Sequence, residues 1–95
     1  MSIILKKEHF EPYLNQNFNM KGEGVDGISL ELNNITDSSN DDAYRFEVVF
    51  IGPKEPMLPQ MVYTLVHEEM GEINLFLVPF AVGKYEAVFN YLKEQ

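Results

Sequence analysis

The sequence predicts a single α+β domain over residues 1–95, mostly β: a small antiparallel barrel or sandwich of five to six strands with a short N-terminal helix. Five short runs of apolar residues, separated by turn residues, follow one another through residues 28–92, where we expect the antiparallel sheet. No segment between them is long enough for the helices of a parallel βαβ fold. The chain has one domain's length and is 45% hydrophobic, which is enough apolar surface for a packed core.

The helix is expected within residues 6–14. Phe10 and Leu14 lie four residues apart, which is the spacing of one helix face. Pro12 limits this helix to one or two turns, because proline disrupts a helix interior. The segment KGEGVDG (21–27) then predicts a loop, since it holds three glycines.

The strands are expected where apolar and polar residues alternate, or where β-branched and aromatic residues dominate. The first two runs alternate cleanly, so one face of each is apolar and the other polar. The five runs are ISLEL (28–32), YRFEVVFI (44–51), MVYTLVH (61–67), INLFLVPF (73–80) and YEAVFNYL (85–92).

One of these strands, INLFLVPF, is apolar on both faces. Leu75 and Leu77 face one way, and the opposite face carries Phe76, Val78 and Phe80. Only one face is internal in a barrel this small, so we expect the other to be covered. Three covers remain open: the helix and loops of the chain itself, a second subunit, or a protein partner.

The segment PKEPMLP between two strands contains two overlapping P-x-x-P units. Such units can dock in aromatic grooves, but proline cannot donate to a β ladder and collects where pairing ends. The segment therefore favours a stiff strand connection. Its tip carries two apolar residues with no evident place in the core. The candidate partner-binding residues are Met57, Leu58, Phe76, Val78 and Phe80.

The formal net charge of −8, from 15 acidic and 7 basic residues, disfavours binding to nucleic acid or to an anionic membrane surface. No apolar run approaches the roughly 18 residues of a membrane-spanning helix, so we expect no membrane insertion. The N-terminus lacks the pattern of a secretory signal, which predicts the cytoplasm as the compartment, at least at synthesis. Because the chain has no cysteine, disulfides and thiolate chemistry are excluded.

The sequence offers no catalytic, cofactor-binding or metal-binding constellation, so we expect no enzyme. His67 precedes Glu68 and Glu69, but adjacent strand residues point to opposite faces. A histidine at a strand end is more commonly hydrogen-bonded to a neighbouring loop. The acidic loop DSSNDD (37–42) lacks the glycine and terminal glutamate of an EF-hand. Its composition is that of an ordinary turn, and ion binding there remains an open alternative.

From residue 44 onward, the order of motifs resembles a family of small bacterial domains, DUF6916. The shared motifs are Phe-x-Gly-Pro at a strand end, a strand with Tyr then His, Leu-Phe-Leu-Val-Pro, and Tyr-Glu-Ala-x-Phe-Asn. In this chain they lie at 50–53, 63–67, 75–79 and 85–90. One departure is Met61, where the family usually has Gly.

The resemblance implies a small β-rich fold and no established reaction. Family members often lie beside phage-tail-like proteins, which implies an accessory or structural role in a larger bacterial assembly, such as a phage-tail-like one. We therefore expect a non-enzymatic protein-interaction module that binds a protein partner or forms a homo-oligomer, without a cofactor. The alternative is a small-molecule or carbohydrate-binding module that uses the mouth of the barrel.

Overall fold

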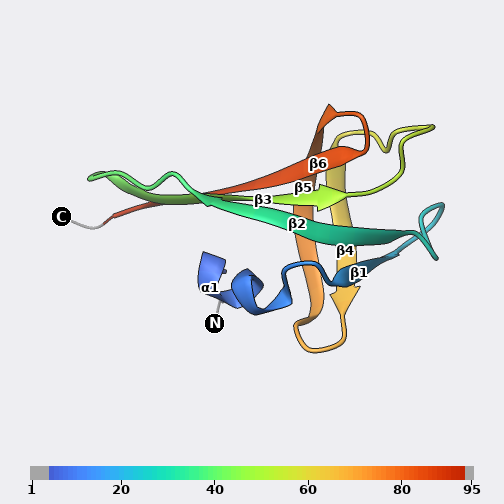
Figure 1. Cartoon of the computed structure of the whole chain (residues 1–95), viewed down its shortest axis with the longest axis horizontal. Helices are drawn as coiled ribbons and strands as arrows, with labels where there is room; N and C mark the ends of the chain where they lie inside the picture. Colours follow the sequence, from blue (N-terminus) through green and yellow to red (C-terminus); the bar gives the residue numbers. More distant parts are fainter. Residues whose placement is uncertain (1–4, 94–95) are drawn as a thin grey trace.

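A closed barrel of six antiparallel strands forms the body of the molecule, with one short helix at its N-terminal end (Figure 1). This computed structural model describes residues 5–93. The strand order around the barrel is β1-β2-β3-β6-β5-β4. The predicted fold class is confirmed. The elements are α1 (Lys7–Phe10), the 3-10 turn η1 (Glu11–Tyr13), β1 (Asn17–Lys21), β2 (Ser29–Asp37), β3 (Ala43–Ile51), β4 (Met61–His67), β5 (Gly71–Ala81) and β6 (Lys84–Leu92).

The N-terminal helix is a single α-helical turn followed by the 3-10 turn that contains Pro12. Phe10 is fully buried, and its ring lies 6.1 Å from that of Phe46 and 5.7 Å from that of Phe89. Leu14, which we predicted on the same helix face, lies beyond the end of η1 and is exposed. In the described part of the chain, 5–93, no helix is long and apolar enough to cross a membrane.

Strand β1 lies outside the predicted sheet, which began at residue 28. Its five residues alternate in burial, with Phe18 and Met20 inside and polar residues outside. Phe18 pairs with Leu30 of β2, and Met20 pairs with Leu65 of β4. This short strand therefore closes the barrel. It was missed because only two of its five residues are apolar, in the middle of a polar stretch.

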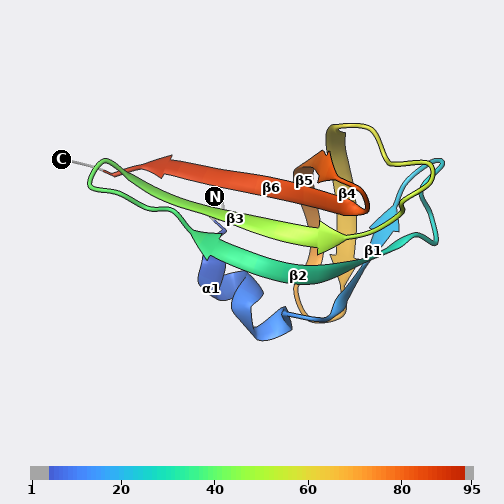
Figure 2. The ribbon, with the colours of Figure 1, turned by 45° about the horizontal axis from the view of Figure 1, so that its top comes forward.

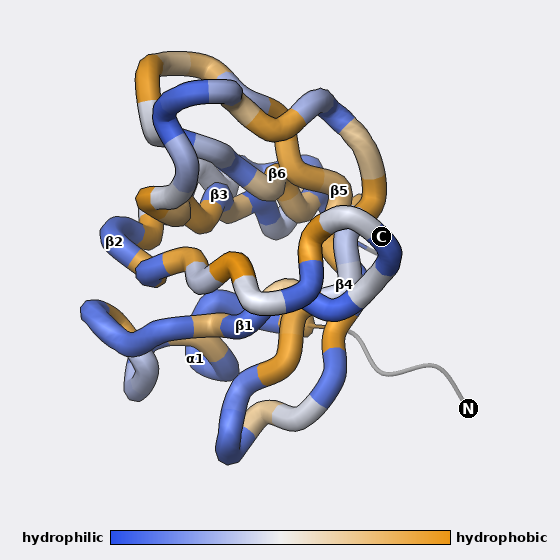
Figure 3. The backbone as a smooth tube through the Cα atoms, turned by 90° about the vertical axis from the view of Figure 1, so that its right-hand side faces the viewer, coloured by the Kyte–Doolittle hydropathy of each residue, from blue (hydrophilic) through white to orange (hydrophobic). Residues whose placement is uncertain are grey.

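The core fills the inside of the barrel with side chains from every strand and from α1. Figure 3 shows apolar and polar residues interleaved along the backbone, as expected of strands with one buried face. In β5 the buried residues are Leu75 and Leu77. The largest fully buried side chains are Tyr85, Phe10, Phe18, Phe46, Phe50, Leu30, Leu32, Leu65, Leu77 and Val48.

Three strands extend well past the barrel and form an arm. Strand β5 pairs with β6 only between residues 78–81 and 84–86, whereas β3 pairs with β6 over the full length of both. Figures 1 and 2 show β2, β3 and β6 continuing side by side beyond β4 and β5. We define the arm as residues 34–37, 43–48 and 87–92. The molecule is accordingly elongated, with extents of 44 × 28 × 22 Å.

Candidate functional site

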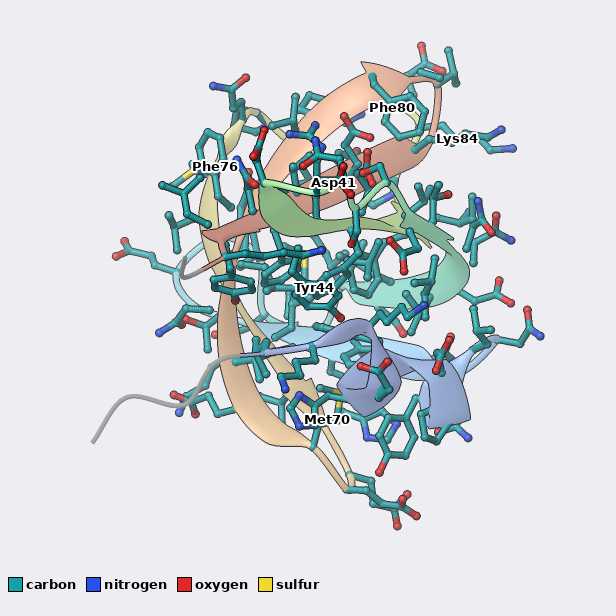
Figure 4. All side chains as sticks on the ribbon, turned by 90° about the vertical axis from the view of Figure 1, so that its left-hand side faces the viewer. Asp41, Tyr44, Met70, Phe76, Phe80 and Lys84 are labelled. Atoms are coloured by element: carbon teal, nitrogen blue, oxygen red, sulfur yellow. The ribbon has the colours of Figure 1, made fainter. Side chains whose placement is uncertain are left out.

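The outer face of β5 is apolar and open to solvent. Phe76 and Phe80 are 49% and 50% exposed, while Val78 between them is half-buried. Figure 4 shows both phenylalanine side chains on the outside of the barrel. The alternation of β5 places Phe76 and Val78 outside, because Leu75 and Leu77 occupy the inner face, and Phe80 follows at the register shift between Pro79 and Ala81. The structure thus brings together three of the five predicted partner-binding residues.

A fourth apolar residue joins them from the neighbouring strand. Val62 of β4 pairs directly with Phe76 and is 58% exposed. Cross-strand partners share one face of a sheet, so Val62 lies on the same face as Phe76 and Val78. We call the four exposed or half-buried residues of these two strands the outer patch: Val62, Phe76, Val78 and Phe80. Sequence reasoning missed Val62, although its alternation with the inward-facing Tyr63 and Leu65 places it outside.

The chain's own helix does not cover the outer patch. This differs from the first expectation, that the helix and loops of the chain itself cover the apolar face of β5. The helix packs instead on the arm, where Phe10 contacts Phe46 and Phe89. Its single turn is too short to reach both surfaces. Within residues 5–93, Phe76 and Phe80 therefore remain half exposed.

The proline loop, which is the PKEPMLP segment (53–59) between β3 and β4, is hydrogen-bonded to Tyr85 and contributes to the core. The buried Tyr85 hydroxyl donates a hydrogen bond to the carbonyl oxygen of Pro53 at 2.6 Å and accepts one from the N–H of Leu58 at 2.9 Å. The sulfur of Met57 accepts a hydrogen bond from the N–H of Gly83 at 3.1 Å. The Met57 and Leu58 side chains both pack against the core cluster.

The prediction that Met57 and Leu58 have no place in the core is therefore wrong. Aspartate at either position would bring a charge against apolar core residues, which costs stability. Such variants would unfold the loop before they reported on binding. The outer patch, whose side chains point away from the core, is the better candidate surface.

His67 closes the turn between β4 and β5. Its Nδ1 accepts hydrogen bonds from the N–H groups of Glu69 and Met70, at 3.0 and 3.2 Å. Because both donors face Nδ1, the ring proton lies on Nε2 and is donated to the side-chain oxygen of Gln16 at 2.8 Å. Two aromatic rings pack on the imidazole, which is buried. Both ring nitrogens are thus engaged in structural hydrogen bonds.

The acidic loop is organised by turn hydrogen bonds. One oxygen of the Asp37 carboxylate lies 2.8 Å from the Lys7 ammonium, and the other accepts the N–H of Ser39. These bonds, chiefly the one from Lys7, hold the pKa of the Asp37 carboxyl well below its usual range. Asn40 accepts the N–H of Asp42. Among residues 5–93, no three His, Asp or Glu side chains gather where they could hold a metal ion.

An open groove of about 520 Å³ lies between the N-terminal helix and the β4–β5 hairpin. Its apolar lining includes Tyr13, Met70 and Ile73, and Glu8 and Glu72 lie beside them. In the described part of the chain, no buried side-chain nitrogen or oxygen lacks a hydrogen-bond partner. The polar side chains that line the groove, Glu8, His9, Glu72 and Asn74, are exposed to solvent.

The chain was compared with known proteins by sequence and by structure. A family model described as a domain of unknown function (DUF6916) matches residues 5–89, which include α1 and most of every strand. Neither a curated protein nor a solved structure matches the chain.

Proposed function

Because the chain belongs to the DUF6916 family, whose description carries no activity, we propose a function from its surface: a non-enzymatic protein-interaction module. In this proposal it serves as an accessory piece of a larger bacterial assembly, such as a phage-tail-like one. The outer patch is the observation that carries the proposal, because it combines two half-exposed phenylalanines with valines from two paired strands.

The outer patch has the chemistry of an interface core. Aromatic side chains are enriched in such cores because they bury a large area with few rotatable bonds. Fully burying a phenylalanine contributes roughly 1.5–3 kcal/mol. Covering the exposed halves of Phe76 and Phe80 would accordingly contribute roughly 1.5–3 kcal/mol together.

The net charge indicates which kind of protein surface would fit. A chain with 15 acidic and 7 basic residues attracts a partner whose contact surface is ringed by lysine and arginine. Such charges would speed the encounter, while the apolar contact would hold the complex. The partner is therefore expected to be an apolar patch with a basic rim.

A non-enzymatic role is supported by the side chains best suited to catalysis, because they are hydrogen-bonded or ion-paired within the fold. Both nitrogens of His67 are hydrogen-bonded within the fold, and Asp37 is paired with Lys7. The alternative, a small-molecule or carbohydrate-binding module, has less support. Side chains fill the barrel, and the open groove beside the helix has no unpartnered buried polar atom among the described residues.

The test is affinity capture from a lysate of the native host, with two variants of equal charge change. Phe76→Lys places a charge in the outer patch, whereas Asn34→Lys places one on the exposed part of β2. We expect the wild-type domain and Asn34→Lys to retain the same protein, and Phe76→Lys to lose it while keeping its melting temperature. Equal recovery with all three, or no reproducible partner, would contradict the proposal.

A further inference from the structure

One edge of β6 is left without a partner strand along the arm. The opposite edge pairs with β3 continuously, from Ala43–Leu92 to Ile51–Lys84. The edge toward β5 is paired only at Lys84, Tyr85 and Glu86, after which β5 diverges. Within the described range, 5–93, residues 87–92 thus present a free row of backbone donors and acceptors.

The two edges of the arm are built differently. On β2, the register shifts between Leu32 and Asn34, the exposed residues include Asn34 and Thr36, and Asp37 is tied to Lys7. Bulges and charges of this kind prevent an edge strand from pairing with another chain. The β2 edge is therefore protected against strand addition.

The free edge of β6 has none of these protections. Its sequence, AVFNYL, contains no charge and no proline, and its pairing with β3 shows no register shift. Val88 and Leu92 point outward and are 44% and 83% exposed. A long apolar edge without such protection is a template for a further strand.

The order of residues along this edge indicates that the added strand is β6 of a second copy of the chain. When two copies are related by a two-fold axis perpendicular to the sheet of the arm, an outward-facing residue of one copy pairs with an outward-facing residue of the other. The two paired positions must therefore lie on the same face of β6. With the axis at Asn90, Val88 of each copy faces Leu92 of the other and the two Asn90 amides face each other. On the inner face, Phe89 then faces Tyr91.

Moving the axis by one residue destroys this match. An axis at Phe89 pairs Val88 with Asn90 and Leu92 with Glu86, which places apolar side chains opposite polar ones. An axis at Val88 would need Tyr85 and Glu86, which already pair with β5, and an axis at Tyr91 would set Asn90 against Leu92. The axis at Asn90 avoids both problems and pairs Val88 with Leu92 and Phe89 with Tyr91, which is the favourable cross-strand arrangement. We infer that two copies of this chain dimerise by antiparallel pairing of their β6 edges about Asn90, which joins the two arms into one six-stranded sheet.

This dimer surface is separate from the outer patch, so it neither requires nor excludes the proposed partner. The paired segment is uncharged, but each copy carries a net charge of −8. Salt screens such repulsion, so the dimer should strengthen as ionic strength rises. A six-residue strand pair buries less than a standard interface, and a dissociation constant of about 10–100 μM is expected.

Analytical ultracentrifugation tests the inference over concentrations up to about 0.5 mM, well above the expected dissociation constant. The wild-type mass should approach twice 11.0 kDa as concentration rises. Asn90→Lys brings two ammonium groups face to face on the axis and should keep the chain monomeric. Thr36→Lys, the matched change on the β2 edge, should dimerise like wild type. A monomeric wild type, or a dimer that Asn90→Lys leaves intact, would overturn the inference.

Cross-linking tests the register itself. The native chain has no cysteine, so a single introduced cysteine can be cross-linked only to a second molecule. Asn90→Cys places the two sulfur-bearing carbons about 4.5–5.5 Å apart, slightly beyond the roughly 3.5–4.5 Å of a disulfide, so a short bis-thiol-reactive reagent rather than oxidation should yield a covalent dimer. Thr36→Cys is the control and should remain mostly monomeric. Equal cross-linking of the two variants would show that the pairing is not centred on Asn90.

Discussion

Tyr85→Phe should destabilise the fold although it removes a single oxygen atom. The Tyr85 hydroxyl bridges the two ends of the proline loop, through the carbonyl of Pro53 and the N–H of Leu58. Phenylalanine would fill the same buried space but leave both backbone groups without this partner. The loop would then have to open to water to satisfy them.

The structure sets the size of the effect. Leaving a buried hydrogen-bonding group unpaired costs about 1–3 kcal/mol. The two loop groups are only partly buried, so water reaches them after a small shift and the total stays near 2 kcal/mol. In a domain of this length, that loss lowers the melting temperature by roughly 8–16 °C.

Urea unfolding followed by circular dichroism measures the loss, and amide hydrogen exchange locates it. Exchange at the Leu58 N–H should accelerate more than exchange in the strands, because the loop opens locally. Tyr91→Phe is the matched control: the Tyr91 ring is half-buried and stacks on Tyr44, so a change below about 0.5 kcal/mol is expected. The reasoning fails if the two variants lose the same stability, or if Leu58 exchange is unchanged.

Two further predictions concern Gly52 and Asp37. A β-carbon on Gly52 would clash with the Leu30 side chain and lie 3.2 Å from the Tyr85 ring, so Gly52→Ala should cost about 1–3 kcal/mol in urea unfolding; a neutral result would mean that the core yields freely there. The Asp37 pKa lies below its ordinary value of 3.8, so its contribution to stability is complete above that pH and is lost as the pH falls through the lower folded-state pKa. Asp37→Asn should therefore lower the melting temperature near neutral pH, and the difference from wild type should shrink below pH 3.8; a difference independent of pH would contradict this origin.

Local alternation predicted most of the fold because strand faces repeat every two residues. The two faces of β5 were read correctly, with Leu75 and Leu77 inside and Phe76 and Phe80 outside. The helix was placed correctly for a related reason, since Pro12 limits its length. Each of these features depends on residues within a few positions of one another.

The features that the sequence did not predict depend on long-range contacts. Tyr85 bonds to backbone groups that lie 32 and 27 residues before it, and nothing in the local pattern of β6 indicates these partners. The core packing of Met57 and Leu58 follows from that same contact. Strand β1 was missed because its two apolar residues become core residues only through their pairing with Leu30 and Leu65 on the neighbouring strands.

The early divergence of β5 from β6 accounts for the second of the two surfaces proposed to bind protein, the free edge of β6. Had β5 stayed paired with β6 beyond Val78, the pattern of the existing pairs would have carried on to Phe76 opposite Val88, and the β6 edge would have been satisfied internally. Instead β5 diverges from β6 while its other edge stays paired with β4, so Phe76 keeps Val62 as its neighbour and residues 87–92 are left open. The divergence thus leaves the β6 edge unpaired, whereas the alternation of β5 sets the apolar face. The two can be disabled separately, by Phe76→Lys and Asn90→Lys, because no residue belongs to both.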